Sequence, residues 1–243
     1  MTSTLRCTGR LCNHLIRNVA VSLVAKKNNL FAEYGYYNEI QSLGIDLFVG
    51  EKKYDKYMTL PEEDIMEFLE YDDLTCDLII VEWHTFQTKE FTNYLYQYFR
   101  EEGVQTNIIQ KNQYQERYKN NNDCYVHIRL GDVIQQNPGF QYYDKAISQL
   151  SFDNLYISSD SIDHEICKQI IEKYPKTVVI QQDQIDTIKF ASTCKHIVLS
   201  HGTYSACIGY LAFFSDIYYP AIDDKTIWCG DIFSIPSWNC IEF

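Results

Sequence analysis

The fold class is decided by residues 124–132, which read CYVHIRLGD. This stretch is apolar enough for a buried strand, and it ends in charged residues around a glycine. With a period of two, alternate side chains share a face, Tyr125, His127 and Arg129 on one side and Val126, Ile128 and Leu130 on the other. Gly131 permits a sharp turn, so Arg129 stands where the strand ends.

Strand and helix patterns alternate on both sides of this stretch. Downstream we expect strands at 154–158, 177–180, 196–199 and 216–219, with helices at 143–150, 162–170, 186–193 and 203–214. Upstream we expect strands at 4–7 and 77–81, the latter buried on both faces, and helices at 11–24, 62–71 and 91–102, the last ending at Gly103. This order predicts an α/β fold with open parallel sheets, in which ligands bind beyond the carboxyl ends of the strands.

Composition restricts the partners. A net charge of −12 and a pI near 4.9 disfavour broad nucleic-acid binding, although they allow one small basic pocket. The longest apolar run, at 207–214, is far shorter than the roughly 18 residues of a membrane span. Charged residues interrupt the N-terminal stretch, so we also expect no signal peptide.

Cysteine and histidine spacing indicates the compartment. The chain has 9 cysteines but no C-x-x-C pair, and 6 histidines but no H-x-x-x-H pair. We therefore expect reduced thiols, a cytoplasmic protein and no structural metal site.

Two loops after expected strands carry candidate anion-binding residues. The guanidinium of Arg129 is a fixed fork for a diphosphate, with Asp132 holding it; the alternative is an ordinary Arg–Asp salt bridge. The second loop, residues 200–205 (SHGTYS), combines hydroxyl groups with the backbone N–H groups of a helix N-terminus. Its alternative is a plain Ser/Thr cap.

A third loop, residues 9–14 (GRLCNH), enters the first expected helix. It is placed to meet a ligand across an interdomain cleft. The alternative is a capping turn with a solvated arginine.

Together the three loops resemble the fucosyltransferases of glycosyltransferase family 11, the α-1,2-fucosyltransferase family, and more distantly those that make α-1,6 and protein O-linked fucose. The family motif H-x-R-R-G-D is matched at His127, Arg129, Gly131 and Asp132. The family's strand ending in an acid looks like residues 155–160, and its acid-led helix, strand and S-x-(S/T)-(F/Y)-S element look like residues 186–205. Residues 9–14 look like its G-x-L-G-N-Q turn, whereas residues 33–122 contribute little.

The resemblance implies a GT-B-like fold, with two Rossmann-type halves whose open parallel sheets face each other across a cleft. The polar stretch 111–123 is the best linker candidate. We therefore expect an acceptor-side half at 1–118 and a GDP-sugar-binding half at 119–243. The implied reaction is inverting transfer of fucose from GDP-fucose to a glycan hydroxyl, with no metal and no cofactor besides the donor.

The resemblance also implies roles for single residues. Arg129 would bind the diphosphate, His127 would lie against the nucleotide, and Asp186 would accept from the guanine N–H groups. Arg10 and Asn13 would reach the donor or the acceptor from the first half. The remaining candidates, all in the second half, would line the donor site: Asp160, Ser200, Gly202, Thr203, Tyr204 and Ser205.

A leaving diphosphate needs its charge offset. The sequence has no D-x-D motif for a metal, so we expect Arg129 and the helix N-terminus at Thr203 to supply the offset. An inverting enzyme usually has a base near the acceptor hydroxyl, and Glu33, Glu82 and His84 are candidates.

Departures from the family pattern keep two alternatives open. Leu130 replaces the second arginine of the motif, and Ala206-Cys207 stand where many members have tryptophans. One alternative is a different GDP-sugar or linkage; the other is an inactive relative that holds a nucleotide or glycan. A nucleotide hydrolase or kinase is disfavoured because no G-x-x-x-x-G-K-(S/T) loop is present.

Overall fold

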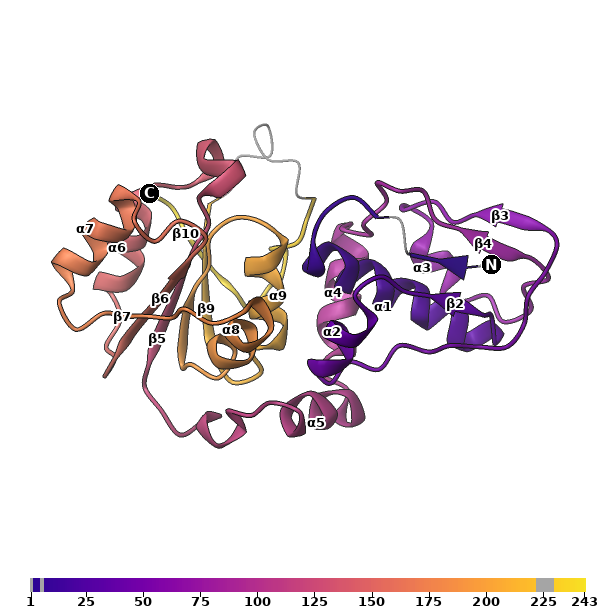
Figure 1. Ribbon diagram of the computed structural model, residues 1–243, viewed down its shortest axis with the longest axis horizontal. Coiled ribbons are helices and arrows are strands. Elements are labelled where there is room, and N and C mark those ends of the chain that lie inside the picture. Colours follow the sequence, from indigo (N-terminus) through magenta and orange to yellow (C-terminus); the bar gives the residue numbers. More distant parts are fainter. Residues whose placement is uncertain (1, 5–6, 222–229) are drawn as a thin grey trace. The chain divides into compact units, whose positions relative to one another are not determined.

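The computed structural model describes residues 2–4, 7–221 and 230–243 (Figure 1). The chain forms two compact units. Unit 1 comprises Met1–Ile108 and Gly230–Ser234, and unit 2 comprises Ile109–Cys229 and Ile235–Phe243. The division falls earlier than the expected boundary at 118, because the polar stretch 111–123 is bonded to unit 2.

Unit 2 is built on a sheet of six parallel strands, in the order β10-β9-β8-β5-β6-β7. In chain order the strands are β5 (Cys124–Ile128), β6 (Leu155–Ser159), β7 (Val178–Val179), β8 (His196–Val198), β9 (Asp216–Pro220) and β10 (Asn239–Ile241). From β5 the chain proceeds to β6 and β7 on one side and returns to β8 and β9 on the other. The strand order therefore reverses between β5 and β8, and ligands bind beside such a switch point.

Helices cover both faces of this sheet. On one side lie α6 (Phe140–Ser148) and α7 (Glu165–Lys173), and on the other α8 (Gln184–Ala191) and α9 (Thr203–Leu211) (Figure 1). Val126 and Ile128 of β5 share a buried core with Tyr142 and Ile147 of α6. His127 faces the opposite way, toward α9, where it bonds Ser205. The predicted period of two along β5 is thus confirmed.

Most helices and strands of unit 2 lie where the sequence predicted them, with two differences. The acid that caps α8 is Asp183, whose carboxylate accepts from Ile185 N and Asp186 N at 2.9 and 2.8 Å. Asp186 therefore lies within the first turn and does not lead the helix. Strand β10 was not expected, since residues 239–241 are too few to show a period.

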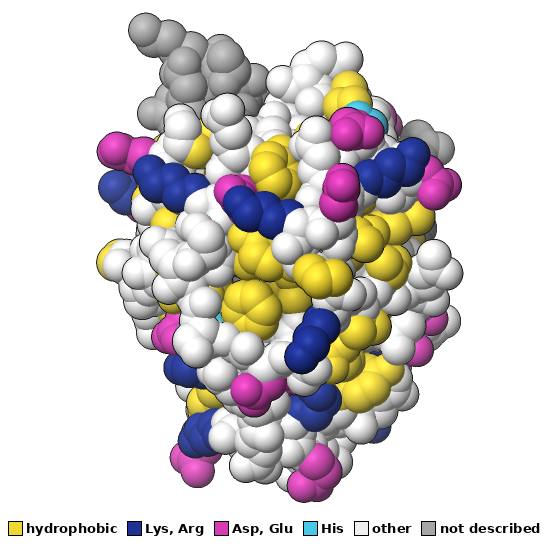
Figure 2. Space-filling view, turned by 90° about the vertical axis from the view of Figure 1, so that its left-hand side faces the viewer, with side chains coloured by type: hydrophobic (Ala, Val, Ile, Leu, Met, Phe, Trp, Pro, Cys, Tyr) yellow, Lys and Arg dark blue, Asp and Glu magenta, His cyan; other side chains and the backbone are white. Residues whose placement is uncertain are grey.

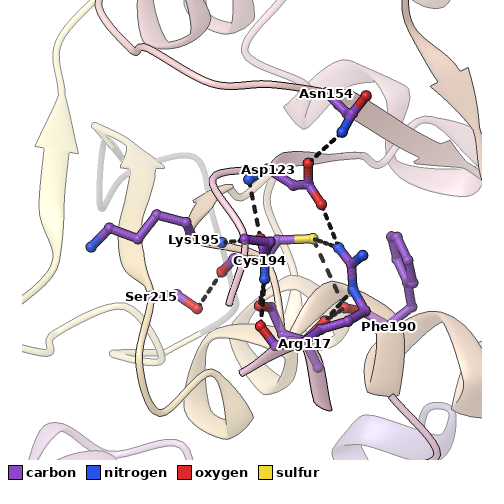
Figure 3. A network of polar contacts seen from close by, with 9 residues as sticks. Arg117, Asp123, Asn154, Phe190, Cys194, Lys195 and Ser215 are labelled. Carbon is purple, nitrogen blue, oxygen red and sulfur yellow. Dashed lines mark hydrogen bonds and ion pairs between the residues drawn. The ribbon is translucent and has the colours of Figure 1, made fainter. Parts of the chain in front are cut away.

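A polar network ties the amino ends of the strands to the stretch 111–123 (Figure 3). Arg117 donates to Asp123 Oδ2 at 2.7 Å and to Thr193 Oγ1 at 3.0 Å. The other carboxylate oxygen of Asp123 accepts from Asn154 Nδ2 at 2.8 Å. The guanidinium also lies 4.5 Å from the ring centre of Phe190. These bonds explain why the expected linker packs as part of unit 2, through the short helix η1 (Gln115–Arg117).

The outer face over α6 and α7 is mixed in character. Figure 2 shows Lys and Arg side chains scattered among Asp and Glu, with hydrophobic side chains between them. Among the residues that the structure describes, no helix has the length and hydrophobicity needed to cross a membrane.

Unit 1 has shorter strands in two parallel pairs. The first pair is β1 (Thr2–Ser3) with β2 (Ala32–Glu33), and the second is β3 (Tyr57–Thr59) with β4 (Asp77–Ile79). Its helices are α1 (Leu11–Asn28), α2 (Tyr37–Ser42), α3 (Ile65–Phe68), α4 (Lys89–Tyr98) and α5 (Glu102–Gln110), the last crossing the division between the units.

Several expectations for unit 1 were wrong. Ile79 of β4 is 47% exposed, so this strand is not covered on both faces. Gly103 lies inside α5 and does not end a helix. The expected helix at 62–71 is a single turn, α3. The first strand, β1, ends at Ser3, before the strand expected at 4–7; Thr4 and Cys7 are not in a strand, and residues 5 and 6 lie outside the described part. Helix α1 is buried nearly all round, because polar as well as apolar side chains point inward.

Candidate functional site

The candidate site lies at the carboxyl ends of β5 and β8, on either side of the switch point. Arg129 follows the last residue of β5, and the loop 200–205 connects β8 to α9. Strands β5 and β8 are hydrogen-bonded neighbours, with Val126 paired to Val198. The two loops singled out in the sequence are therefore adjacent.

A buried hydrogen-bonded chain joins these loops. His127 Nδ1 is hydrogen-bonded to Ser205 Oγ at 2.6 Å, and the same oxygen accepts from Ser200 N at 3.0 Å. Ser200 Oγ in turn accepts from Tyr143 OH at 2.8 Å. His127 is 5% exposed, and Ser200 and Ser205 are fully buried. These hydroxyl groups hold the loop in place from beneath.

Burial, together with the nearby Arg129 charge, lowers the pKa of His127 from 6.5 to about 3. The imidazole is therefore neutral at physiological pH. Burial also lowers the pKa of His201 to about 4. Both imidazoles are therefore neutral at physiological pH, whereas the guanidinium of Arg129 brings a positive charge to the end of β5.

Arg129 is held by two carboxylates. Its guanidinium forms ion pairs with Asp132 and with Asp160, the residue after β6. The Asp160 side chain also accepts from Leu130 N at 2.9 Å, so it fixes the backbone next to the arginine. The salt bridge between Arg129 and Asp132, which the sequence offered as the alternative, does exist, but Asp160 forms a second ion pair with the same guanidinium. The Arg129 side chain is 17% exposed, which leaves part of it open to solvent.

The turn after Arg129 depends on a glycine. Gly131 has a φ of +22°, and a Cβ there would come within 2.5 Å of Asp160 Oδ2. Any side chain at this position would push Asp160 away from the guanidinium. The turn continues as the short helix η2 (Gly131–Gln136).

Helix α9 begins at Thr203, directly after Gly202 with its φ of +91°. Tyr204 packs its ring against His127, with the ring centres 5.0 Å apart, and its hydroxyl donates to Gln184 O at 2.8 Å. Tyr204 therefore joins β5, α8 and the start of α9. Asp186 is half-buried in the first turn of α8, two residues after Gln184.

The structure thus brings together most of the residues predicted in the second half. Ser205 and Ser200 contribute buried hydroxyl groups, whereas Thr203 and Tyr204 lie nearer the surface. Whether each contacts a ligand stays a prediction. In the described part of the chain, no three His, Cys, Asp or Glu side chains are grouped as metal ligands.

Sequence reasoning missed Asn137 and Tyr143. Asn137 Nδ2 donates to Arg129 O at 2.7 Å and to the Tyr143 hydroxyl at 2.9 Å, and its Oδ1 accepts from Gly139 N at 2.8 Å. The pair links the arginine backbone to Ser200. The signal was an Asn-Pro-Gly turn at 137–139, which is typical of a tight, side-chain-bonded loop.

In unit 1, the predicted residues Arg10 and Asn13 lie at the start of α1, and Glu82 and His84 lie in the loop after β4. Asn13 Oδ1 accepts from Gln87 Nε2 at 3.1 Å, and Thr8 N donates to Glu82 O at 2.9 Å. Arg10, at the start of α1, and Glu82 are exposed. Their predicted neighbour His84 is half-buried, and its Nδ1 lies 3.4 Å from Leu60 O. Glu33 ends β2 in the same unit.

Comparisons with known proteins give a match by fold alone. No protein-family model and no curated protein sequence matches the chain. The α-1,6-fucosyltransferase NodZ soaked with GDP-fucose has a TM-score of 0.54 and 11% sequence identity, over 86% of this chain and 91% of that one.

Two further NodZ structures agree. NodZ co-crystallised with GDP has a TM-score of 0.54 and 11% identity, over 89% of this chain and 93% of that one. Selenomethionine NodZ from Bradyrhizobium has a TM-score of 0.53 and 11% identity, over 89% and 92%. The chain therefore has an α/β fold with parallel sheets, similar to that of the GT-B-like fucosyltransferase NodZ.

Proposed function

We propose that this protein is a glycosyltransferase that moves L-fucose from GDP-fucose to a glycan hydroxyl, with inversion at the anomeric carbon. The observation that carries the proposal is the placement of Arg129. A guanidinium fixed by two carboxylates stands at the end of β5, beside the N-terminus of α9, where the strand order reverses. The NodZ structures soaked with GDP-fucose and co-crystallised with GDP support the same choice of donor.

Arg129 and α9 would stabilise the leaving diphosphate. As the bond to the sugar breaks, negative charge grows on the diphosphate oxygens. A fixed guanidinium and a helix N-terminus offset that charge without a metal ion. Asp132, whose side chain is 59% exposed, releases the guanidinium more easily than Asp160, which also holds Leu130 N.

We assign the nucleotide to unit 2 and the acceptor to unit 1. His127 and Asp186 would lie against the nucleotide, and the first turn of α9 against the phosphates. Glu82 and His84, after β4, are the candidate bases for the acceptor hydroxyl. The sequence motifs favour an α-1,2 linkage, whereas NodZ makes an α-1,6 linkage, so the linkage is left to analysis of the product.

The test compares Arg129→Ala with Lys168→Ala. Lys168 is exposed on α7, on the other face of the sheet, so its loss changes the net charge equally. Loss of one charged donor costs about 10²–10³ in rate. We expect Arg129→Ala to lose transfer by that factor and to weaken GDP binding in calorimetry. Lys168→Ala should behave as the wild type.

Three outcomes would contradict parts of this proposal. Near-normal turnover of Arg129→Ala with saturating donor would remove the role of that residue. Loss of activity on adding a chelator would contradict metal independence. Tight GDP binding without GDP release from any donor and acceptor pair would indicate a binding protein and not a transferase.

A further inference from the structure

Trp83 is the most exposed of the large hydrophobic side chains that the structure describes, at 70%. It lies in the loop 80–88 between β4 and α4, which we call the β4 loop. Single exposed hydrophobic residues are common on protein surfaces and need no explanation. Trp83 differs because the backbone on both sides of it is fixed.

That backbone is held by Arg17 of α1, which is fully buried. The guanidinium donates to the carbonyls of Ile80 at 3.1 Å and Val81 at 2.7 Å, and to those of Glu82 at 3.2 Å and His84 at 3.0 Å. The last two are the neighbours of Trp83 in the chain. A buried arginine that binds four carbonyls of one loop sets the conformation of that loop.

Further bonds hold the β4 loop at each end. Glu82 O accepts from Thr8 N at 2.9 Å, and His84 N donates to Val81 O at 3.0 Å. At the far end, Gln87 N donates to Glu62 Oε1 at 2.8 Å, and Gln87 O accepts from Asp231 N at 2.9 Å. The β4 loop is therefore rigid, and it presents an indole ring to solvent on a preorganised backbone.

The position and the neighbours of Trp83 fit a sugar. The β4 loop follows the carboxyl end of a parallel strand, the edge at which α/β sheets bind ligands. The carboxylate of Glu82, next in the chain, is exposed. A pyranose ring has a face of C–H groups that packs on an indole, and hydroxyl groups around its edge that donate to a carboxylate. An aromatic ring beside an acid offers both contacts.

We propose that Trp83 is the platform on which a sugar ring of the acceptor glycan stacks, with Glu82 accepting a hydrogen bond from a hydroxyl of that sugar. The proposal rests on the proposed function for the identity of the acceptor as a glycan. In this proposal Trp83 selects and orients the acceptor, and it takes no part in breaking or forming the bond to the transferred sugar.

Binding is tested first, without any donor. The probes are the methyl β-glycosides of galactose, N-acetylglucosamine, glucose and mannose, with sorbitol as a polyol control. The indole N–H resonance of Trp83 is assigned by its loss in Trp83→Phe. We expect at least one glycoside, and not sorbitol, to shift this resonance at millimolar concentrations. No shift with any of the four glycosides would overturn the proposal.

Kinetics then separate acceptor from donor. Trp83→Ala should raise the KM of a fucose-accepting glycoside about tenfold, because it removes a stacked apolar face. Trp83→Phe should restore most of that loss. The rate of GDP release from GDP-fucose without acceptor, and GDP affinity, should stay as in the wild type. Tyr57→Ala, which removes another aromatic ring of unit 1 that is 60% exposed, is the matched control and should leave every value unchanged.

The two failures are distinguishable. An unchanged acceptor KM in Trp83→Ala, with GDP binding intact, overturns the role of Trp83 alone. Absence of GDP binding and of GDP release in the wild type overturns the proposed function, while the glycoside titration still reports on Trp83. A fall in melting temperature of Trp83→Ala without a KM change would show a packing role and would also overturn the proposal.

Discussion

Replacing Ser205 with alanine tests whether the buried chain beneath the candidate site holds its loop. The Ser205 hydroxyl bonds two buried partners, His127 Nδ1 at 2.6 Å and Ser200 N at 3.0 Å. Alanine fills nearly the same volume, so the substitution removes bonds with little change in packing. A buried group left without a partner costs about 1–3 kcal/mol. We expect Ser205→Ala to lower the free energy of unfolding by about 2–4 kcal/mol.

A double-mutant cycle with His127→Leu isolates the histidine. The leucine variant has no imidazole that could lose its hydrogen bond. In that background Ser205→Ala therefore leaves only Ser200 N without a partner. Its cost should fall to about 1–2 kcal/mol, and the difference between the backgrounds measures the His127–Ser205 coupling.

Urea unfolding followed by circular dichroism gives these free energies, and an unchanged slope shows that the same surface is exposed. Ser148→Ala removes an exposed hydroxyl of α6 and should stay within about 0.5 kcal/mol of the wild type. Equal costs of Ser205→Ala in both backgrounds would refute the coupling. A cost below about 0.5 kcal/mol would refute the buried chain itself.

Two further predictions concern stability. Between pH 6.5 and about 3 the unfolded chain binds a proton on His127 that the folded chain excludes. The contribution of His127 to the free energy of unfolding is therefore fully present above pH 6.5, and it falls by about 1.4 kcal/mol per pH unit between pH 6.5 and about 3. Urea unfolding at a series of pH values measures this slope, and the same slope in His127→Leu would contradict the prediction. In α9, a Cβ at Gly209 would lie 2.6 Å from Trp238 Cη2 and 3.2 Å from Leu199 Cδ1. Gly209→Ala should cost about 1–3 kcal/mol by thermal melting, and a stabilised variant would show that the indole moves aside.

The sequence predicted unit 2 well because its strands alternate with helices at regular intervals. In β5, alternate side chains point to the core and to the candidate site, and this alternation can be read from neighbouring residues alone. The pairing of Arg129 with Asp160 is not local, since the two residues are joined only through the register of β5 and β6. The family resemblance predicted an acid after β6, but only the structure shows that this acid, Asp160, contacts the guanidinium of Arg129.

Unit 1 was harder to predict, for physical reasons. Its strands have two or three residues each, too few to display a period. Helix α1 carries Arg17, which reads as a solvated charge in the sequence but is fully buried. Its partners are backbone carbonyls, which every residue possesses, so no side-chain pattern marks them.

The chain returns from unit 2 to unit 1 at Gly230–Ser234, and then re-enters unit 2, where it forms β10. This short return is bonded within unit 1, where Asp231 N donates to Gln87 O and Asn93 Nδ2 to Ser234 O at 3.1 Å. A protease nick at 109–123 would thus yield two polypeptides, with five residues of the second still anchored in the first. Separate expression of the two halves would remove the late segment from unit 1, and shortening the C-terminal end would remove an edge strand from unit 2.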